Sequence, residues 1–390
     1  MSEEKLVPKL RFSGFDDEWT KINLGELSKI GKGFTPSTSN PSFWDGELYW
    51  LSIADMNQGK YIKQTSKKIS LEGSKNKDPI EKGTLLMSFK LSLGKLGILT
   101  KDMYTNEAIC NFKWKNNNIS TEYMYYYLSS INIMKYGSQA AKGITLNNET
   151  LNTIPVILPN FDEQNKISNF LSKIDKKIEL LEKKHQAYED FKKYLMQQIF
   201  TQKLRFDFSE DWKIVKIKDI FDERSEKGFD ELELLSVTLN EGVIKRSEIE
   251  SKDNSNDNKS NYKHVLPNDM VYNSMRMWQG ASGVSSYEGI VSPAYTILIP
   301  KNVHSPFFGY YFKTHEMIYQ FKKYSQGLTS DTWNLKYPLI SEIKLKIPSL
   351  EEQKQITNLF ETIDIKIEIL ENIICDLKNF RKGLLQQMFV

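Results

Sequence analysis

The sequence predicts an α+β protein built from two related halves, each made of a globular α+β module followed by one long helix. The first observation behind this prediction is a segment that occurs twice, at residues 160–200 and 349–389. A shift of 189 positions places Glu163-Gln164 on Glu352-Gln353. The second observation is that shorter matches precede both copies. Internal duplication with so long a period predicts pseudo-two-fold symmetry within one chain, not a solenoid of short repeats.

The two modules match at their ends and differ in their middles. Leu10-Arg11-Phe12 returns as Leu204-Arg205-Phe206, and Tyr126-Tyr127-Leu128 returns as Tyr310-Tyr311-Phe312. Between these matches, β-branched and aromatic runs broken by Gly, Asn and Ser clusters indicate short strands joined by loops. This pattern favours a common scaffold that carries two different recognition surfaces. The predicted domains, in the order module, helix, module, helix, are residues 1–159, 160–203, 204–348 and 349–390.

Both copies of the duplicated segment predict long helices that share an apolar seam. Apolar or aromatic side chains recur at alternating spacings of four and three residues, which is typical of a coiled coil. The polar exceptions are His185, Lys192 and Arg381. A helix about 60 Å long cannot bury such a stripe alone, so we expect the two helices to pair. The predicted seam residues are Ile167, Leu171, Ile174, Ile178, Leu181, Leu195, Ile356, Phe360, Ile363, Ile367, Leu370 and Leu384.

Each long helix is predicted to begin directly after a proline. Asn160-x-x-Glu163 follows Pro159, and Ser349-x-x-Glu352 follows Pro348. In a capping box of this kind, the first side chain accepts a hydrogen bond from the backbone of the acidic residue. The acidic side chain in turn bonds back to the N–H of the first residue. We therefore expect both helices to start with such a box.

The composition indicates a globular protein. The chain has 390 residues, 39% hydrophobic and 26% charged, and this length predicts two or more domains. The two cysteines, Cys110 and Cys375, show no metal-ligand spacing, which favours a reducing compartment. The N-terminus lacks an apolar signal segment, and no run of 18 apolar residues occurs. We therefore expect a cytoplasmic protein without a membrane segment.

Charge is unevenly distributed between the two modules. The net charge is only +3, but residues 60–101 hold ten lysines against three acidic residues. Residues 201–349 carry twenty basic and twenty acidic groups. A lysine-rich segment is consistent both with a solvated surface and with a nucleic-acid face. The neutral second module implies that any DNA affinity comes partly from elsewhere, such as a partner subunit.

Catalytic motifs are missing from the sequence. No GxxxxGK[ST] phosphate loop occurs, and the four histidines show no HxxxH or HExxH spacing. Asn40-Pro41-Ser42-Phe43 is close to the tetrapeptide that binds the target amine in amino-methyltransferases. It lacks the second proline, however, and no cofactor-binding Phe-x-Gly-x-Gly loop precedes it, so a turn is the better interpretation. We predict no catalytic residue, metal site or bound cofactor in this chain.

Several polar residues have side chains suited to binding DNA. Lysines beside glycines can approach phosphate closely, whereas Asn, Gln and Arg side chains can bond adenine and guanine edges. Each candidate is weak alone, because a loop lysine or glutamine is usually only solvated and tryptophans more often belong to the core. The candidate DNA-binding residues are Lys32, Thr35, Asn57, Lys90, Ser92, Lys95, Lys142, Asn273, Arg276, Trp278 and Gln279.

The chain resembles the specificity subunit of a type I restriction–modification enzyme over nearly its whole length. The resemblance rests on the module–helix–module–helix order and on the twin Pro-x-(Phe/Leu)-(Asp/Glu)-Glu-Gln helix starts. It also rests on the twin Gln-Gln-(Ile/Met)-Phe helix ends. Residues 86–94 and 272–280 are similar to segments of that family's target recognition domains. The order and duplication of these motifs make the resemblance specific.

This resemblance implies a function and a set of partners. Each recognition domain binds one half of a split double-stranded DNA target, and the helices form an antiparallel coiled coil that sets the spacer between the halves. The helices also dock two methylation subunits, which hold S-adenosylmethionine and methylate adenine. Endonuclease subunits that translocate DNA with ATP and Mg²⁺ join this core, whereas the chain itself catalyses nothing. The neutral second module departs from the family and leaves its phosphate contacts open.

Two other classes of function are consistent with parts of the sequence. One is a non-catalytic coiled-coil adaptor that holds two protein-binding modules. The lysine excess at residues 60–101 favours DNA over this alternative, and a salt-dependent shift of duplex DNA separates the two. The other is a self-sufficient methyltransferase, which the missing cofactor loop disfavours.

Overall fold

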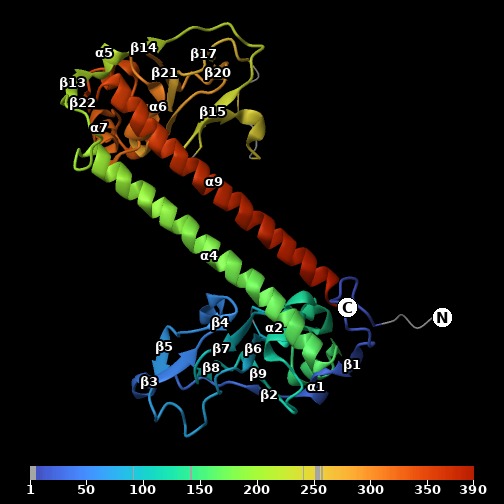
Figure 1. Cartoon of the computed structure of the whole chain (residues 1–390). Coiled ribbons are helices and arrows are strands. Elements are labelled where there is room, and N and C mark those ends of the chain that lie inside the picture. Colours follow the sequence, from blue (N-terminus) through green and yellow to red (C-terminus); the bar gives the residue numbers. More distant parts are fainter. Residues whose placement is uncertain (1–5, 91, 141–142, 240, 251–254, 256–257) are drawn as a thin grey trace. The chain divides into compact units, whose positions relative to one another are not determined.

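The computed structural model describes residues 6–90, 92–140, 143–239, 241–250, 255 and 258–390. The chain divides into two compact units, which can be followed by colour in Figure 1. We call residues 1–182 with 372–390 the first unit, and residues 183–371 the second unit. The long helices α4 (Phe161–Phe200) and α9 (Leu350–Gln387) each contribute a segment to both units. The predicted domain boundaries lie instead at the helix ends and stay a prediction.

The first unit is built on a five-stranded sheet. In hydrogen-bonded order its strands are β2 (Ser28–Lys32), β9 (Ile109–Trp114), β6 (Leu85–Ser88), β7 (Leu96–Leu99) and β4 (Tyr61–Ile62). β9 is antiparallel to β2 and β6, β7 is antiparallel to β6, and β4 is parallel to β7. Helix α2 (Thr121–Ser130) packs on β6 and β7 and buries three of its four tyrosines in the core.

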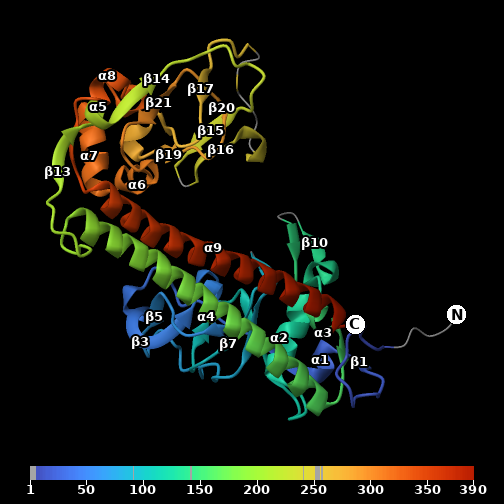
Figure 2. The same cartoon turned by 45° about the horizontal axis from the view of Figure 1, so that its top comes forward.

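A second, three-stranded sheet stands beside the first. Its strands, in order, are β5 (Lys67–Ile69), β3 (Trp44–Leu51) and β8 (Tyr104–Thr105). Trp50, Ile69 and Tyr104 form its small core. The remaining elements of this unit (Figure 2) are β1 (Thr20–Asn23), α1 (Leu24–Leu27), η1 (Pro41–Phe43), η2 (Ala54–Gln58), η3 (Ile133–Tyr136), β10 (Ser138–Ala140), β11 (Gly143–Thr145), α3 (Asn148–Asn152) and β12 (Pro155–Leu158).

The second unit repeats the scaffold of the first. The strands of its sheet, in order, are β14 (Phe221–Arg224), β21 (Tyr295–Pro300), β18 (Met270–Asn273) and β19 (Ser282–Val284). The order and the antiparallel pairings are those of β2, β9, β6 and β7. Helix α6 (Ser305–Tyr311) packs on β18 and β19 as α2 packs on β6 and β7. The structural repeat therefore continues into the module middles, where the sequence repeat fades.

Two-stranded pairs and short helices complete the second unit. β13 pairs with β22, β15 with β16 and β17 with β20, all antiparallel. These elements are β13 (Lys213–Lys216), α5 (Ile217–Ile220), β15 (Leu235–Thr238), β16 (Gly242–Lys245), η4 (Arg246–Glu248), β17 (Lys263–Val265), η5 (Met277–Gln279), β20 (Gly289–Val291), α7 (His315–Tyr324), η6 (Ser330–Thr332), α8 (Tyr337–Ile340) and β22 (Lys344–Ile347).

Within each unit, the segments of α4 and α9 run in opposite directions. The ion pairs between them are Asp175–Arg381 and Glu182–Lys378 in the first unit, and His185–Glu371 and Lys192–Asp364 in the second. Residue numbers rise along α4 as they fall along α9, so the predicted antiparallel pairing is confirmed. The three polar exceptions in the seam each face a carboxylate of the other helix. Of the predicted seam residues, only Leu181 is half-buried, and the rest are buried.

The start of each long helix is held by a duplicated ion pair. Arg11 donates to the Glu163 carboxylate through Nε and Nη2, at 2.8 Å each. Arg205 donates to Glu352 in the same way, at 3.0 and 2.9 Å. Both carboxylates are buried. The predicted capping boxes are therefore half right: the cap side chains accept from the acidic residues' N–H groups, but the acidic side chains pair with arginine.

The glutamine after each of these carboxylates joins the long helix to a short one. Gln164 Oε1 accepts a hydrogen bond from the backbone N–H of Ser120, which caps α2, at 2.9 Å. Gln353 Oε1 accepts one from His304, which precedes α6, also at 2.9 Å. Each glutamine also donates to the carbonyl of the proline before its helix, at 3.0 Å. The duplicated Glu-Gln dipeptide thus fixes the module to the helix. No helix in the described ranges is long and apolar enough to cross a membrane.

Candidate nucleic-acid interface

Most of the described candidate residues of the first unit lie at one end of the five-stranded sheet. Lys32, the last residue of β2, pairs in register with Cys110 near the start of β9. Ser88, the last residue of β6, pairs with Ile109 at the start of the same strand. Strands β2 and β6 therefore end where β9 begins, and the loops that follow them emerge together.

Residues 89–95, called the first recognition loop below, connect β6 to β7 at this end. The Gly94 N–H donates to the Ser88 carbonyl at 2.8 Å, and the Ser88 N–H donates to the Lys95 carbonyl at 2.9 Å. Gly94 has a φ of 79°, which strains any residue with a side chain. A Cβ there lies 3.3 Å from Cγ2 of Ile133, so the loop packs closely on the segment after α2.

Several predicted DNA-binding residues meet around this loop. Lys95 Nζ donates to Asn57 Oδ1 at 2.8 Å, which joins the loop to η2. Lys90, Ser92 and Lys32 are exposed, and Lys90 Nζ lies 5.6 Å from the ring centroid of Phe89. The loop therefore presents positive charge and hydrogen-bonding groups to solvent at the end of the sheet.

Thr35 has contacts of its own, apart from this group. The Thr35 hydroxyl donates to the Glu107 carboxylate and accepts from Asn106 Nδ2 at 3.0 Å. These contacts join the Thr35 side chain to the loop that holds Asn106 and Glu107. Lys142 lies outside the described residues.

Lys60 connects the recognition end of the first unit to its helices. Its ammonium donates to the Ser172 hydroxyl of α4 at 2.8 Å and to Tyr126 Oη of α2 at 3.2 Å, and it pairs with Glu122. Burial lowers the pKa of the Lys60 ammonium, while the hydrogen bond and charge of Glu122 act in the opposite direction. Since Lys60 follows η2 directly, this network anchors the segment that carries Asn57.

Residues 274–281, called the second recognition loop below, occupy the corresponding place in the second unit. They connect β18 to β19 as the first recognition loop connects β6 to β7. The Arg276 N–H donates to the Asn273 carbonyl at 2.9 Å. Gly280 has a φ of 89°, and a Cβ there lies 2.8 Å from Cδ1 of Ile318 in α7. Arg276 and Gln279 are exposed, and Asn273 is half-buried.

Trp278 is part of the support of the second recognition loop. Its indole N–H donates to the Met275 carbonyl at 3.1 Å. Its ring meets that of Trp333 edge to face, with centroids 5.3 Å apart, and Lys322 Nζ lies 5.6 Å from the Trp333 ring. Trp278 therefore positions the neighbouring exposed Arg276, and Trp333 is a supporting residue that the list of sequence candidates omits.

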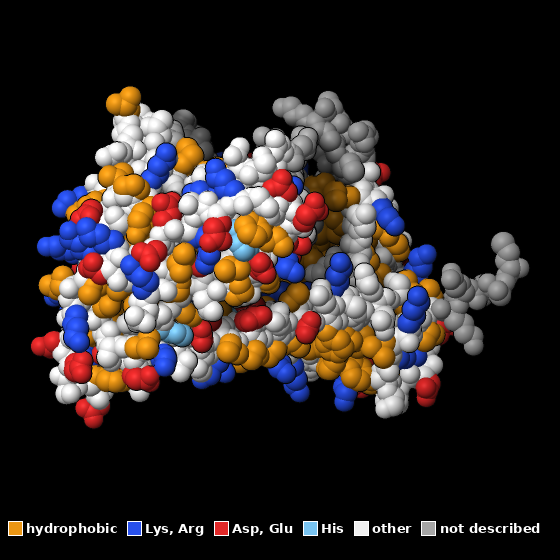
Figure 3. All heavy atoms as spheres, turned by 90° about the horizontal axis from the view of Figure 1, so that it is seen from above, with side chains coloured by type: hydrophobic (Ala, Val, Ile, Leu, Met, Phe, Trp, Pro, Cys, Tyr) orange, Lys and Arg blue, Asp and Glu red, His pale blue; other side chains and the backbone are white. Residues whose placement is uncertain are grey.

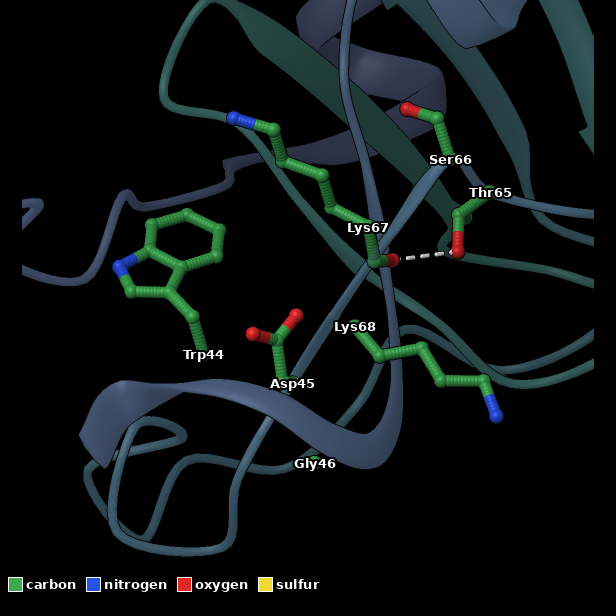
Figure 4. Close-up of a pocket in the computed structure, with 7 residues that line it drawn as sticks. All are labelled: Trp44, Asp45, Gly46, Thr65, Ser66, Lys67 and Lys68. Atoms are coloured by element: carbon green, nitrogen blue, oxygen red, sulfur yellow. Dashed lines mark hydrogen bonds between the residues drawn. The ribbon is translucent and has the colours of Figure 1, made fainter. Parts of the chain in front are cut away.

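The two units differ in the charge beside the sheet. In the first unit, Lys67 Nζ lies 5.3 Å from the Trp44 ring and Lys77 Nζ lies 4.3 Å from the Phe34 ring. Neither lysine was among the sequence candidates, although the lysine excess of residues 60–101 points to them. Figure 4 shows Lys67 and Lys68 leaving β5 on opposite sides, with Lys67 on the side of Trp44.

In the second unit, carboxylates and cations are paired beside the sheet, and Arg224 lies 3.3 Å from Glu226. His264 lies between Glu226, at 3.4 Å, and Glu288, at 2.9 Å, and stacks on Phe229 at 3.9 Å. On the face of the molecule seen in Figure 3, basic and acidic side chains are interspersed. Among the described residues, no group of three or more His, Cys, Asp or Glu side chains is arranged to hold a metal ion.

Two modules with one scaffold, recognition loops at matching places and a shared helix pair define a duplicated recognition protein. Residues 16–189 and 209–379 each match the type I restriction modification DNA specificity domain. The chain therefore belongs to this family, as the sequence resemblance predicted.

Individual relatives support the same assignment. The chain is 26% identical to the type I restriction enzyme MjaVIII specificity subunit of Methanocaldococcus jannaschii, over 90% of this chain and 88% of that protein. It is 24% identical to the MjaIX specificity subunit of the same organism, over 52% of this chain and only 51% of that protein. The crystal structure of a type I restriction–modification S subunit from M. genitalium has the same fold, with a TM-score of 0.60. That alignment has 16% identity and covers 98% of this chain and 99% of that one.

Proposed function

We propose that this chain is the non-catalytic subunit that selects the DNA target of a type I restriction–modification complex. The first unit recognises one half of a bipartite double-stranded target, and the second unit recognises the other half. The observation that carries this proposal is the matching position of the two recognition loops on matching sheets. The same position supports a common way of approaching DNA, and the different side chains support two different base sequences.

The exposed side chains of the loops fit the two kinds of DNA contact. Arg276 can bond O6 and N7 of guanine in the major groove, and Gln279 can bond N6 and N7 of adenine. Lys32 and Lys90 carry flexible point charges suited to phosphate. Lys95 is held by Asn57, so these two side chains act together at one position. The proposal thus assigns base recognition to both loops and phosphate contact mainly to the first unit.

The long helices support docking of two copies of one partner. Both long helices expose several large apolar side chains in each unit. Among them are Leu180 and Phe380 in the first unit, and Phe191 and Ile369 in the second. The shift of 189 positions relates Leu180 to Ile369 and Phe191 to Phe380. Exposed apolar side chains in matching places fit identical partners. We infer that they bind two methylation subunits that hold S-adenosylmethionine, in the cytoplasm, where endonuclease subunits with ATP and Mg²⁺ join them.

The helices are also proposed to set the spacer between the half-targets. Inserting four residues after Leu181 lengthens α4 by about 6 Å and keeps the apolar seam roughly in phase. We expect the non-specific spacer to grow by one or two base pairs, because DNA rises about 3.4 Å per base pair, with both half-targets retained. An active variant with an unchanged spacer means that the partner subunits set the distance.

The decisive experiment exchanges one recognition region. Residues 30–140 are replaced by the equivalent segment of another family member, and the chain is expressed with its methylation subunit. Sequencing of methylated adenines is expected to show one changed half-target and one retained half-target. A matching exchange in the second unit serves as the reciprocal control and is expected to change only the other half. Changes in both halves, or methylation by the purified chain alone, contradict the proposal.

A further inference from the structure

The lysines of the three-stranded sheet are held by a small aromatic cluster. Trp44 Nε1 donates to the Ser37 carbonyl at 3.1 Å, and Trp50 Nε1 donates to the Phe34 carbonyl at 2.9 Å. These bonds fix the segment that follows Lys32 onto β3. The edge of the cluster carries Lys67, over Trp44.

Lys77 lies on the same cluster and is positioned by its backbone. Tyr104 Oη donates to the Lys77 carbonyl at 2.8 Å, and the Lys77 ammonium lies over Phe34. Phe34 follows Lys32 by only two residues, so Lys77 and Lys32 belong to one continuous surface. Lys32, Lys67 and Lys77 are all exposed. An aromatic face beneath an ammonium restricts its movement without neutralising its charge.

Two other lysines, Lys68 of β5 and Lys101 of the segment between β7 and β8, pack on a different aromatic ring. Lys68 and Lys101 both lie over Tyr49, at 5.4 and 4.2 Å from its ring centroid. Side chains alternate along a strand, so Lys68 points away from the face that carries Lys67. Lys68 is also paired with Glu47 at 3.4 Å. These lysines match Lys67 and Lys77 in aromatic support, but they occupy the opposite face.

We propose that Lys32, Lys67 and Lys77 form a phosphate-binding surface that extends the recognition end of the first unit along the DNA backbone. This inference rests on the proposed function and deepens it by assigning sequence-independent affinity to one unit. Phosphate contacts fix orientation on the duplex without specifying bases. Residues 201–349, by contrast, carry equal numbers of basic and acidic groups, among them Glu226 and Glu288 beside His264. The first unit therefore supplies most of the salt-dependent affinity of the chain.

Asp45 is the acidic group of the same surface. Figure 4 shows its carboxylate between Trp44 and the two lysines of β5. The backbone of Asp45 has a φ of 60°. Its charge limits how closely phosphate approaches on that side. Asn also tolerates this conformation, so Asp45→Asn removes the charge with little strain. We expect this change to strengthen binding to every duplex, not only to the target.

The test compares two double variants in the complex with the methylation subunit. Affinity for target and non-target duplexes is measured at several salt concentrations. The slope of log K against log salt is negative, and each lost phosphate contact makes it less steep by about 0.9. The double variant Lys67→Gln with Lys77→Gln is therefore expected to have a slope less steep by about 1.8. The matched control, Lys68→Gln with Lys101→Gln, is expected to retain the original slope. The Arg versions of the first pair keep the charge and are expected to restore it.

The outcomes separate this surface from the wider proposal. A less steep slope on both duplexes, with the methylated motif unchanged, supports the phosphate-binding surface. If the wild-type complex binds its target but the Lys67 and Lys77 variant keeps its slope, the surface is wrong and the proposed function stands. If the control variant at Lys68 and Lys101 loses as much salt dependence, only the net charge matters, and the proposed phosphate-binding surface is also wrong. If the wild-type complex shows no salt-dependent binding to any duplex, the proposed function itself is wrong.

Discussion

The two units share the contacts that attach a module to its helix and differ in what surrounds the recognition loops. Arg11 and Glu163 in the first unit correspond to Arg205 and Glu352 in the second. Tyr126 donates to Asp175 at 2.6 Å as Tyr310 donates to Asp364 at 2.8 Å, and each aspartate also pairs with a cation of the other long helix.

The surroundings of the recognition loops show the opposite behaviour. The first unit places lysines over aromatic rings beside its sheet. The second unit also has lysines over rings, such as Lys322 over Trp333, but it places two glutamates beside His264. Buried charge pairs tolerate little change, because replacing one partner leaves the other unpaired in the interior. Exposed charges are under no such constraint, so they are free to differ with the ligand.

The largest expected effect tests the shared contacts. Arg11→Met leaves the Glu163 carboxylate buried without its partner, and we expect a loss of about 3 kcal/mol in the free energy of unfolding of the first unit. Arg205→Met is expected to cost less, because Trp212 Nε1 also donates to Glu352 at 3.2 Å. Trp19 is the tryptophan of the first unit that corresponds to Trp212. Among the described residues its buried indole N–H has no hydrogen-bond partner, so it gives Glu163 no such support.

Urea denaturation with hydrogen exchange of peptides from each unit measures both losses separately. The conservative variants Arg11→Lys and Arg205→Lys keep the charge but not the two-pronged bond and serve as controls. Equal losses in the two units contradict the role assigned to Trp212. Unchanged stability of both variants shows that the duplicated ion pairs do not hold the helix starts.

The next effect concerns the two recognition loops. Arg276→Ala is expected to reduce discrimination at one base position by about 1–3 kcal/mol, because a bidentate guanine contact is lost. Lys90→Ala, on the matching loop, is expected to weaken binding of all duplexes alike. Competition binding with single-base variants of the target measures both. Uniform weakening by Arg276→Ala identifies a phosphate contact instead.

A smaller effect is expected where the tyrosine meets the helix pair. Asp175→Asn removes the charge that faces Arg381, and we expect a loss of about 1 kcal/mol. Asp364→Asn is expected to lose less, since its side chain is 38% exposed and that of Asp175 is 25% exposed. Thermal unfolding of the two variants beside the wild type measures the difference. A larger loss for Asp364→Asn breaks the equivalence of the two sites.

The sequence predicted those parts of the fold that repeat within it. The duplicated helix starts, with their glutamates, and the seam recur at a constant shift of 189 positions, so the sequence reveals them. The Leu-Arg-Phe segments that hold the partner arginines recur as a motif at a different spacing. The sequence did not predict that the strand order β2-β9-β6-β7 recurs as β14-β21-β18-β19. Its strands keep only their apolar character, and many different residues satisfy a buried strand.

The sequence predicted the candidate site only where the two units repeat the same loop geometry. Gly94 and Gly280 both adopt positive φ just before a strand, and both lie in the segments singled out from the sequence. Lys67 and Lys77 were missed because their position depends on contacts with Trp44 and Phe34, which lie far away in sequence. Thr35 is a candidate in the sequence, but its bond to Glu107 depends on a neighbouring loop.

The smallest expected effect concerns the two glutamates beside His264 in the second unit. Glu226→Gln with Glu288→Gln removes two negative charges beside His264 and keeps hydrogen-bond acceptors for its ring. Two like charges about 10 Å from a phosphate repel it only weakly in water, so we expect about twofold tighter binding of any duplex at low salt. The gain is expected to vanish at high salt, where the charges are screened.

The control for this change is Glu210→Gln with Asp211→Asn, two exposed acidic groups of the same unit. It changes the net charge by the same amount away from the sheet. Titration of a fluorescent non-target duplex at two salt concentrations compares the variants. A gain in both shows that net charge alone sets the affinity. A gain confined to the first pair places the carboxylates of Glu226 and Glu288 beside the DNA.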